Sequence, residues 1–572
     1  MLNINVNEKA NLIWSIADKL TGAYKPHEYG EVILPLTVIR RFDCILENTK
    51  DAVVKKNKEL NLAIKDPILR KVSGYSFYNV SPFSFKTLLD DPDNIEANFR
   101  SYLNGFSENV RNIIERFRFD NHISYMAEKN LLYMVLREFT EPEADMHPEK
   151  ISNVEMGYIF EEIIRKFSEA HNEDAGQHYT PREVIELMVN ILFAEDSDLL
   201  SGNAVAKTLY DPACGTGGML TVAEDHLRRL NSNAKLICFG QEINPQTYAI
   251  CKSDILIKGA NADYIKEGNT LSGDLFKEDK FDYILSNPPF GREWKNEQAA
   301  VEKEQKLGFA GRFGAGVPAI GDSQLLFLLT AISKMKDVKD GGSRIAIIHN
   351  GSPLFTGDAG SGPSEIRKYI IETDLLEAII ALPNDIFYNT GIATYIWVLS
   401  NKKAPHRKGR VQLINANEMY QNRRRNLGNK RNDIPLHHID EITQIYGDFK
   451  ENEVSKIFNN EEFGYAKIVI ERPLLDDNGK MVKKNGRKQP DGKFHDTENV
   501  PLTESIDTYF EREVLPFVPD AWIDKSKTKI GYEIPFTRYF YKYTPPQPSS
   551  ELMAEIMEIE RELDGALKAV FE

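Results

Sequence analysis

The stretch Asp211-Pro-Ala-Cys-Gly-Thr-Gly-Gly218 joins a short apolar segment, residues 208–211, to a helical pattern over residues 219–230. Glycines at such a turn allow unusual backbone angles and let a ligand approach the backbone closely. A second motif, Asn287-Pro-Pro-Phe290, begins 76 positions after Asp211 and follows the apolar segment 281–285. Because both motifs end apolar strands, they predict a ligand crevice with a polar clamp beside it, at the carboxyl edge of a parallel sheet.

The region between Lys207 and Asn401 alternates short apolar segments with helical ones, which predicts an α/β fold with a doubly wound, mostly parallel sheet. No helical pattern separates the last two strands, so the final strand is expected to be antiparallel. This arrangement resembles the Rossmann-like sheet of class I S-adenosylmethionine-dependent methyltransferases. The predicted strands are 208–211, 236–242, 281–285, 343–349, 376–382 and 394–400, and the predicted helices lie near 219–230, 245–258, 323–336 and 364–373.

Further cofactor contacts are predicted around this edge of the sheet. Glu242 ends the second strand, where an acid can accept hydrogen bonds from ribose hydroxyls; a charge at a helix N-terminus is its alternative role. In Gly273-Asp-Leu-Phe276, Asp274 would accept from the adenine amino group and Phe276 would pack on the ring. Thr180-Pro-Arg-Glu183 is predicted to be a capping box whose helix faces the cofactor carboxylate.

The glycine-rich turn excludes two other ligand classes. It lacks the Gly-Lys-Ser/Thr of a P-loop, and it breaks the dinucleotide GxGxxG pattern at the third glycine. A tight turn without a ligand is the remaining alternative, and Cys214 is assigned no chemistry. The candidate cofactor-binding residues are Gln177, His178, Tyr179, Thr180, Pro181, Arg182, Asp211, Ala213, Cys214, Gly215, Thr216, Gly217, Glu242, Asp274 and Phe276.

The clamp Asn287-Pro-Pro-Phe290 supplies the candidate catalytic residues. The exocyclic amino group of adenine is a poor nucleophile because its lone pair is conjugated into the ring. The Asn287 side-chain oxygen and the Pro288 carbonyl could accept from its two hydrogens and localise that pair. Pro288 and Pro289 stiffen the turn, and Phe290 offers a face for stacking the target base. A base inside a duplex would have to be flipped out to reach this clamp.

Residues 291–322 are predicted to form a long glycine-rich connection. We expect it to border the flipped base and to become ordered on DNA, with Arg312 as a candidate DNA contact.

Gln177-His-Tyr-Thr-Pro-Arg182, the glycine-rich turn and the Asn287 clamp occur in an order that resembles the modification (HsdM) subunit of type I restriction-modification systems. The resemblance extends over nearly the whole length. It implies methylation of the exocyclic amine of adenine in double-stranded DNA, with S-adenosyl-L-methionine as the cofactor. It also implies a separate specificity subunit, in a complex of two modification subunits with one specificity subunit that a restriction subunit can join.

Two other functions remain open at this point. The chain could be a stand-alone adenine DNA methyltransferase whose own target-recognition domain lies in residues 405–548, although no duplicated recognition unit is visible there. It could also be a protein-glutamine methyltransferase, because similar clamps hold amide nitrogens; those chains are much shorter.

We expect four regions, because 572 residues exceed what one core can hold. They are a helical N-terminal domain (1–150), the adenine methyltransferase domain (151–404), a mixed charged region (405–548) and a C-terminal helix (549–572). Apolar residues of that last helix recur at steps of three and four, which predicts assembly with a helix of another chain; packing on its own domain is the alternative. The polar segment 475–497 predicts an exposed hairpin or loop without an assigned role.

The charge and the composition of the chain limit which partners it is expected to bind. The net charge is −15, so most of the grip on DNA is expected to come from another subunit. Residues 402–431 contain ten Lys or Arg against one acid, which predicts either a solvated loop or a patch that contacts phosphates or a partner and includes Arg423, Arg424 and Arg425. Four scattered cysteines favour a cytoplasmic protein without a bound metal. Neither a signal peptide nor a membrane span is expected.

Overall fold

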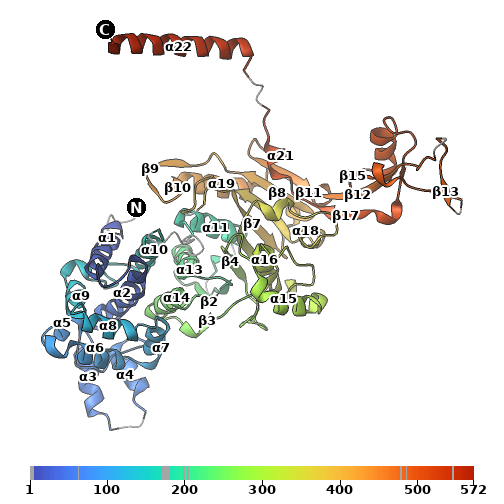
Figure 1. Cartoon of the computed structure of the whole chain (residues 1–572). Helices are drawn as coiled ribbons and strands as arrows, with labels where there is room; N and C mark the ends of the chain where they lie inside the picture. Colours follow the sequence, from blue (N-terminus) through green and yellow to red (C-terminus); the bar gives the residue numbers. More distant parts are fainter. Residues whose placement is uncertain are drawn as a thin grey trace. The chain divides into compact units, whose positions relative to one another are not determined.

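A computed structural model of the chain describes residues 6–61, 64–169, 180–196, 200–202, 205–388, 390–476, 479–484, 486–543 and 547–571. The chain divides into two units, Met1–Ile534 and Pro535–Glu572 (Figure 1).

A sheet with the strand order β11-β8-β6-β7-β5-β4-β1-β2-β3 forms the centre of the first unit. The strands from β1 to β5 pair in parallel, whereas β7 runs antiparallel between β5 and β6. All residues of β6 and β7 are buried, as expected for strands covered on both faces. The predicted class I methyltransferase fold, with its antiparallel strand, is therefore confirmed. The strands are β1 (Ala206–Asp211), β2 (Lys235–Glu242), β3 (Ile265–Glu267), β4 (Tyr283–Ser286), β5 (Arg344–Asn350), β6 (Leu376–Ala381), β7 (Thr394–Ser400), β8 (Arg410–Asn415) and β11 (Ser455–Asn459).

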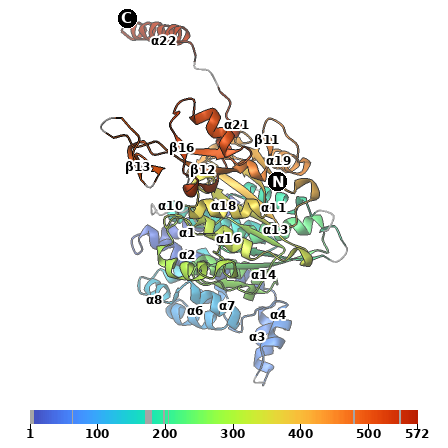
Figure 2. The same cartoon turned by 90° about the vertical axis from the view of Figure 1, so that its right-hand side faces the viewer.

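Helices cover both faces of this sheet (Figures 1 and 2). One face shares a continuous apolar core with α10, α11, α13, α14 and α19. On the other side of the strands lie α16 and α18, of which α16 contacts β5. These helices are α10 (Asn153–Glu169), α11 (Arg182–Ala194), α13 (Gly218–Leu230), α14 (Pro245–Ile257), α16 (Gln324–Ser333), α18 (Gly362–Glu372) and α19 (Leu436–Asp448), with the short α15 (Gln298–Gln305) and α17 (Ser352–Phe355) between them.

The N-terminal region is helical, as predicted, and its core is continuous with that of the sheet. Nearly every residue of α2 is buried, including Arg40 and Asp43, which form an ion pair at 2.8 Å. Because α10 contacts α1, α2 and α13, it connects the two parts. The helices are α1 (Val6–Ala17), α2 (Tyr29–Leu46), α3 (Lys50–Glu59), α4 (Asp66–Ser73), α5 (Phe85–Leu88), α6 (Ile95–Asn104), α7 (Glu108–Arg116), α8 (Asp120–Glu128) and α9 (Leu132–Glu138).

The sheet continues past residue 404, where the sequence predicts a boundary. β8 pairs in parallel with β6, and β11 pairs antiparallel with β8, so both strands extend the central sheet. Beyond them lie a hairpin of β9 and β10 and a second sheet centred on β12. Segment 475–497 includes the hairpin of β13 and β14. The elements are β9 (Gln421–Leu427), β10 (Lys430–Asp433), β12 (Gly464–Glu471), β13 (Lys483–Lys484), β14 (Arg487–Lys488), β15 (Asp496–Pro501), α20 (Ile506–Tyr509), β16 (Trp522–Ile523) and β17 (Lys529–Tyr532).

The second unit contains α21 (Phe536–Phe540) and α22 (Ser549–Phe571), which confirms the predicted C-terminal helix. Large apolar side chains along α22 are exposed: Leu552, Ile556, Ile559 and Leu563 expose 42–61% of their surface. Across the described part of the chain, no helix combines the length and the apolar character that crossing a bilayer requires.

Candidate active site

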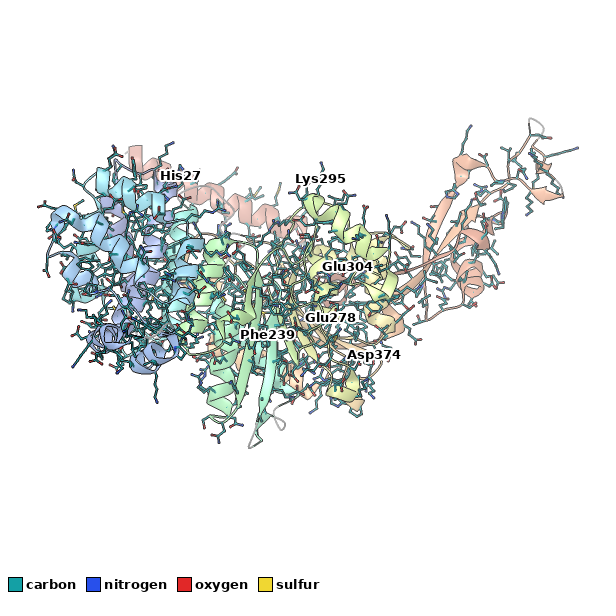
Figure 3. All side chains as sticks on the ribbon, turned by 90° about the horizontal axis from the view of Figure 1, so that it is seen from below. His27, Phe239, Glu278, Lys295, Glu304 and Asp374 are labelled. Carbon is teal, nitrogen blue, oxygen red and sulfur yellow. The ribbon has the colours of Figure 1, made fainter. Side chains whose placement is uncertain are left out.

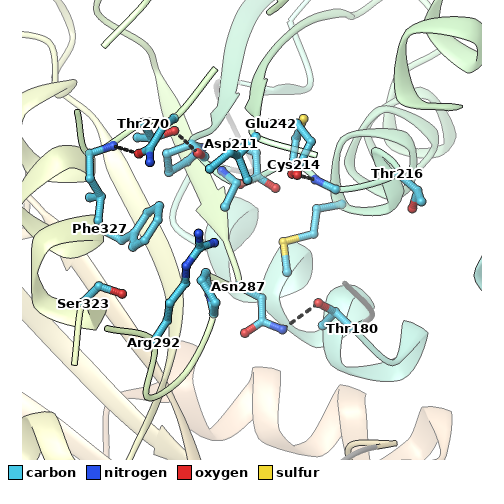
Figure 4. A pocket seen from close by; sticks show the side chains of 18 of the residues that line it. Thr180, Asp211, Cys214, Thr216, Glu242, Thr270, Asn287, Arg292, Ser323 and Phe327 are labelled. Carbon is cyan, nitrogen blue, oxygen red and sulfur yellow. Dashed lines mark hydrogen bonds between the residues drawn. The ribbon is translucent and has the colours of Figure 1, made fainter. Parts of the chain in front are cut away.

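A cavity opens at the carboxyl ends of β1, β2 and β4 (Figure 4). Its lining includes Asp211, Gly215, Thr216 and Glu242, and it also includes Asn287 from the second motif. The structure therefore brings the two motifs together, although 76 positions separate them in the sequence. Ala213, Cys214 and Pro289 line the same cavity.

Two carboxylates organise the floor of the cavity. Asp211 accepts from the Ala213 backbone N–H at 2.9 Å and from the Ser286 hydroxyl at 2.8 Å. Burial raises the pKa of Asp211 to about 7, against the lowering effect of these two hydrogen bonds. Glu242 accepts from the backbone N–H of Gly215 and of Asn244, both at 2.8 Å, so it joins the glycine-rich turn to the end of β2.

The turn requires glycine at Gly217, which stands directly before α13. Its φ of 86° is left-handed, and an added Cβ would lie 2.7 Å from Cys251 Sγ. Gly217 therefore faces Cys251 and not the cavity, whereas Gly215, Thr216 and Gly218 line the cavity. The N-terminus of α13 consequently points at the cavity, which favours an anionic ligand group there.

The clamp residue Asn287 is held by Thr180. The Asn287 Nδ2 donates to Thr180 Oγ1 at 2.8 Å, while the buried Asn287 Oδ1 has no partner among the described residues. A buried carbonyl oxygen without a partner costs about 1–3 kcal/mol, so this atom is suited to a donor that a ligand supplies. Phe290 is half-buried and meets Phe387 edge-to-face at 6.0 Å. Of the clamp, Pro288 and Phe290 are absent from the cavity lining.

The predicted capping box at Thr180-Pro-Arg-Glu183 is wrong. α11 begins at Arg182 after Pro181, and no side chain caps it. The Thr180 hydroxyl is used by Asn287, and Glu183 instead forms an ion pair with Lys430. Long-range partners therefore outweigh the local cap.

Arg182 and Pro181 lie beside the main cavity rather than in its lining. The Arg182 guanidinium lies 4.1 Å from the centre of the Tyr158 ring and lines a smaller neighbouring cavity. Burial lowers the pKa of Arg182 to about 10. Pro181 is buried. Gln177, His178 and Tyr179 lie outside the described residues.

The prediction that Asp274 and Phe276 face the cavity is also wrong. Asp274 forms a 2.5 Å ion pair with Lys334, and the side chain of Phe276 is buried among Tyr210, Phe239 and Phe281. The corresponding edge of the cavity is formed by Asn269, Thr270 and Leu271, shortly after β3. The aromatic residue is needed for the core, and the acid is needed to neutralise a buried lysine.

The prediction that Arg312 contacts DNA is wrong, because its side chain is buried and already paired within the protein. Its side chain is 7% exposed and pairs with the Glu304 carboxylate of α15 at 2.7 Å. Glu304 is labelled in Figure 3. The same guanidinium donates to the carbonyls of Thr270 and Leu271, at 2.7 and 3.1 Å. Arg312 thus supports the backbone that lines the cavity.

Residues 291–322 are not a long irregular loop either, because α15 lies within them. Trp294 is buried, and its Nε1 donates to Ala319 O at 2.9 Å, which closes the segment on itself. A helix and a buried anchor therefore replace the mobile connection that the glycines suggested.

The basic stretch 402–431 does not form one surface patch. Lys402, Lys403 and Arg407 pair with Asp196, Asp374 and Glu195, respectively. On the hairpin β9–β10, Arg423 pairs with Asp433, whereas Arg424 and Arg425 are exposed. Much of the positive charge is therefore used to hold the fold together, and only part of it faces solvent.

The sequence reasoning missed several residues of the cavity. Arg292 and Ser323 lie at one end, where the Ser323 N–H donates to Arg292 O at 3.0 Å. Ser323 Oγ is buried and, like Asn287 Oδ1, has no partner among the described residues. No motif marks these positions, because separate loops bring them together. The other missed residues are Glu161, Ile185, Pro212, Gly218, Met219, Ile243, Asn269, Thr270, Leu271, Glu293, Glu297 and Phe327.

The strand order and the cavity at its carboxyl edge define a class I, Rossmann-like methyltransferase. Residues 152–473 match the N-6 DNA Methylase family, and residues 9–139 match the HsdM N-terminal domain. The chain therefore belongs to the N-6 DNA Methylase family. Among its described residues, no cluster of three or more His, Cys, Asp or Glu could hold a metal ion.

Known proteins similar to this chain are named as methylase subunits of type I restriction enzymes. The MjaIX subunit of Methanocaldococcus jannaschii is 26% identical, over 88% of this chain and 87% of its own length. The HindI subunit of Haemophilus influenzae is 29% identical, over 49% of this chain and 58% of its own length. A methyltransferase subunit from Streptococcus thermophilus shares the fold, with a TM-score of 0.63, 21% identity, and coverage of 80% of this chain and 97% of that one. The resemblance to type I modification subunits is confirmed.

Proposed function

We propose that this chain transfers a methyl group from S-adenosyl-L-methionine to the exocyclic amino group of adenine in double-stranded DNA, as the modification subunit of a type I complex. The observation that carries the proposal is that Asn287 Oδ1 has no partner among the described residues and lies in a cavity that the glycine-rich turn also lines. Membership of the N-6 DNA Methylase family supports the same reaction. It does not favour a protein-glutamine substrate.

The cavity suits the methyl donor at one end. Glu242 is placed to accept from ribose hydroxyls, because each carboxylate oxygen retains a free lone pair beyond its one backbone bond. The N-terminus of α13 suits a carboxylate. When bound, S-adenosyl-L-methionine supplies a methyl group that its sulfonium already activates. The protein then needs to position and polarise the acceptor, which brings up to about 7–11 kcal/mol in favourable cases.

Asn287 performs the polarising step. Its Oδ1 accepts one N–H of the adenine amino group, and the Pro288 carbonyl accepts the other. The nitrogen would bond to the methyl carbon as the sulfonium–carbon bond breaks, which leaves a neutral thioether, and the nitrogen would then release one proton to water. It becomes positive on the way, so these hydrogen bonds strengthen in the transition state more than in the ground state. The Thr180 hydroxyl fixes the amide rotamer by accepting from Nδ2. Thr180 is thus a positioning residue.

The other end of the cavity suits the flipped base. The Phe327 side chain and the buried Ser323 hydroxyl provide an apolar face and a hydrogen-bonding group, and Arg292 is oriented into the same space (Figure 4). A flipped nucleotide needs a hydrogen-bond partner for the ring nitrogens of its base and a cation for its phosphate. Ser323 meets the first need and Arg292 the second.

The test is methyl transfer itself. Purified chain, alone and with its specificity subunit, is incubated with labelled S-adenosyl-L-methionine and unmethylated DNA that carries a site for the complex. Label is expected in N6-methyladenine of the digested DNA when both subunits are present. Label confined to protein would contradict the proposal. Methylation of a defined site by the chain alone would favour the stand-alone alternative instead.

α22 is proposed to assemble the chain with the specificity subunit, because a row of exposed apolar residues lines it. The paired substitutions Ile556→Asp and Leu563→Asp are expected to abolish co-elution of the two subunits on a sizing column while leaving cofactor affinity unchanged. The matched control, Glu555→Gln with Glu562→Gln, changes the polar positions of the same helix. Intact co-elution of the aspartate variant would remove this role from α22.

A further inference from the structure

Segment 474–494 holds an unusual concentration of positive charge. Residues 479–484 and 486–493, here called the basic hairpin, contain six Lys or Arg against one acid, Asp491, in a chain whose net charge is −15. The described lysine side chains of the basic hairpin are exposed. They are Lys480, Lys483, Lys484, Lys488 and Lys493.

The cross-strand register places like charges directly opposite each other. Lys483 pairs with Lys488, and Lys484 pairs with Arg487. Opposite positions hold Cβ atoms about 4.5–5.5 Å apart, and like charges there destabilise a hairpin. The two strands pair regardless, and Gly486 next to them has a left-handed φ of 78°, which favours glycine. The hairpin thus retains a repulsion that an anion between the strands would relieve.

Nothing else in the described structure neutralises these lysines. None of the five forms an ion pair with a described residue, in contrast to Lys402, Lys403, Arg407 and Lys430. One of them, Lys488, lies over the Trp522 ring at 5.4 Å, which orients its ammonium without cancelling its charge.

The basic hairpin is also fixed to its sheet. Leu474 N donates to Gln489 O, Val482 N to Leu474 O, and Asp491 N to Arg472 O, each at 2.8 Å. Arg472 directly follows β12, the central strand of that sheet. The charges are therefore presented on an ordered support.

We propose that the basic hairpin binds backbone phosphates of duplex DNA outside the flipped-base cavity; this rests on the proposed function. Duplex DNA carries one charge per about 1.7 Å of axis, so adjacent lysines can each meet a phosphate. Lysine is a point charge without fixed geometry, which suits contacts that carry no sequence information. On a chain with an acidic balance, such an element offsets the general repulsion of DNA locally.

The test compares the salt dependence of DNA binding by the full chain in complex with its specificity subunit. The variant Lys483→Gln/Lys484→Gln/Lys488→Gln is titrated with a duplex of about 40 base pairs at several salt concentrations. The slope of log K against log[salt] is expected to flatten by roughly two to three, and affinity at about 0.1 M salt to fall roughly ten- to a hundredfold. The rate of methyl transfer at saturating DNA should not change, because none of these lysines lines the cavity. The basic hairpin is attached to the second sheet, not to the strands whose ends form the cavity.

Two controls keep the result interpretable. Lys55→Gln/Lys58→Gln/Lys71→Gln removes the same charge from exposed positions of the helical N-terminal region and is expected to leave the slope nearly unchanged. Lys488→Glu places an opposite charge against Lys483, so it should preserve or raise the melting temperature while still weakening DNA binding.

An unchanged slope in the hairpin variant overturns the proposal. If the hairpin variant kept the slope but lost its association with an acidic protein, that protein would be the ligand. The proposal would be overturned in this case too. If the wild-type chain with its specificity subunit binds DNA with a hairpin-dependent slope but never methylates adenine, the proposed function alone is contradicted. The two failures are therefore distinguishable.

Discussion

Asn287→Ala is expected to lower the rate of methyl transfer by at least about 10²–10³-fold, the cost of removing one preorganised dipole from an active site. Cofactor affinity should remain nearly the same, because Glu242 and the turn at Gly215 hold each other independently of this amide. The loss should appear in kcat as well as in kcat/KM, since the hydrogen bond is strongest in the transition state. Single-turnover transfer to DNA and calorimetric binding of S-adenosyl-L-methionine measure the two quantities.

Thr180→Val is the matched control for this prediction. It preserves the size of the side chain but removes the oxygen that accepts from Asn287 Nδ2 at 2.8 Å. The amide would then rotate, so we expect a smaller loss of rate than in Asn287→Ala, again without loss of cofactor binding. If Asn287→Ala also abolished cofactor binding, the amide would belong to the cofactor end of the cavity. If it left the rate intact, the clamp would not polarise the acceptor.

The sequence predicts the central fold well because its signals are local. β1, β2 and β4 to β7 are short apolar runs bounded by polar turns, and the absence of a helix between β6 and β7 indicates the antiparallel strand. β3 is missed because it has only three residues. β8 and β11 are missed because they lie in a charge-rich region, where their membership of the sheet depends on long-range pairing.

The site is predictable only as far as the motifs extend. Asp211, Glu242 and Asn287 meet because parallel strands end at one edge. The errors come from side chains whose partners are distant in sequence. Thr180 bonds with a residue 107 positions away, and Arg312 is buried against carbonyls 41 and 42 positions away. A local pattern cannot show that a hydroxyl or a charge is already used.

A buried network of charged side chains connects strands β5 and β6. Glu377 of β6 is fully buried and pairs with Arg344 of β5 at 3.1 Å, and Arg407 Nε lies 3.7 Å from the same carboxylate. Burial alone would raise the pKa of Glu377, but the two arginines outweigh it and hold the pKa below its ordinary value. Tyr446 of α19 also bonds to this carboxylate. The network thus joins the central sheet to α19.

Glu377→Gln is therefore expected to destabilise the fold by about 3–5 kcal/mol, because it leaves two buried cations short of one compensating charge. Thermal unfolding followed by circular dichroism should show a clear drop in the midpoint. Glu47→Gln, which removes an exposed ion pair with Lys86, should leave the midpoint almost unchanged. Combining Glu377→Leu with Arg344→Leu should recover part of the loss, since removing both partners restores neutrality. A midpoint unaffected by Glu377→Gln would mean that this carboxylate contributes nothing to the stability of the sheet.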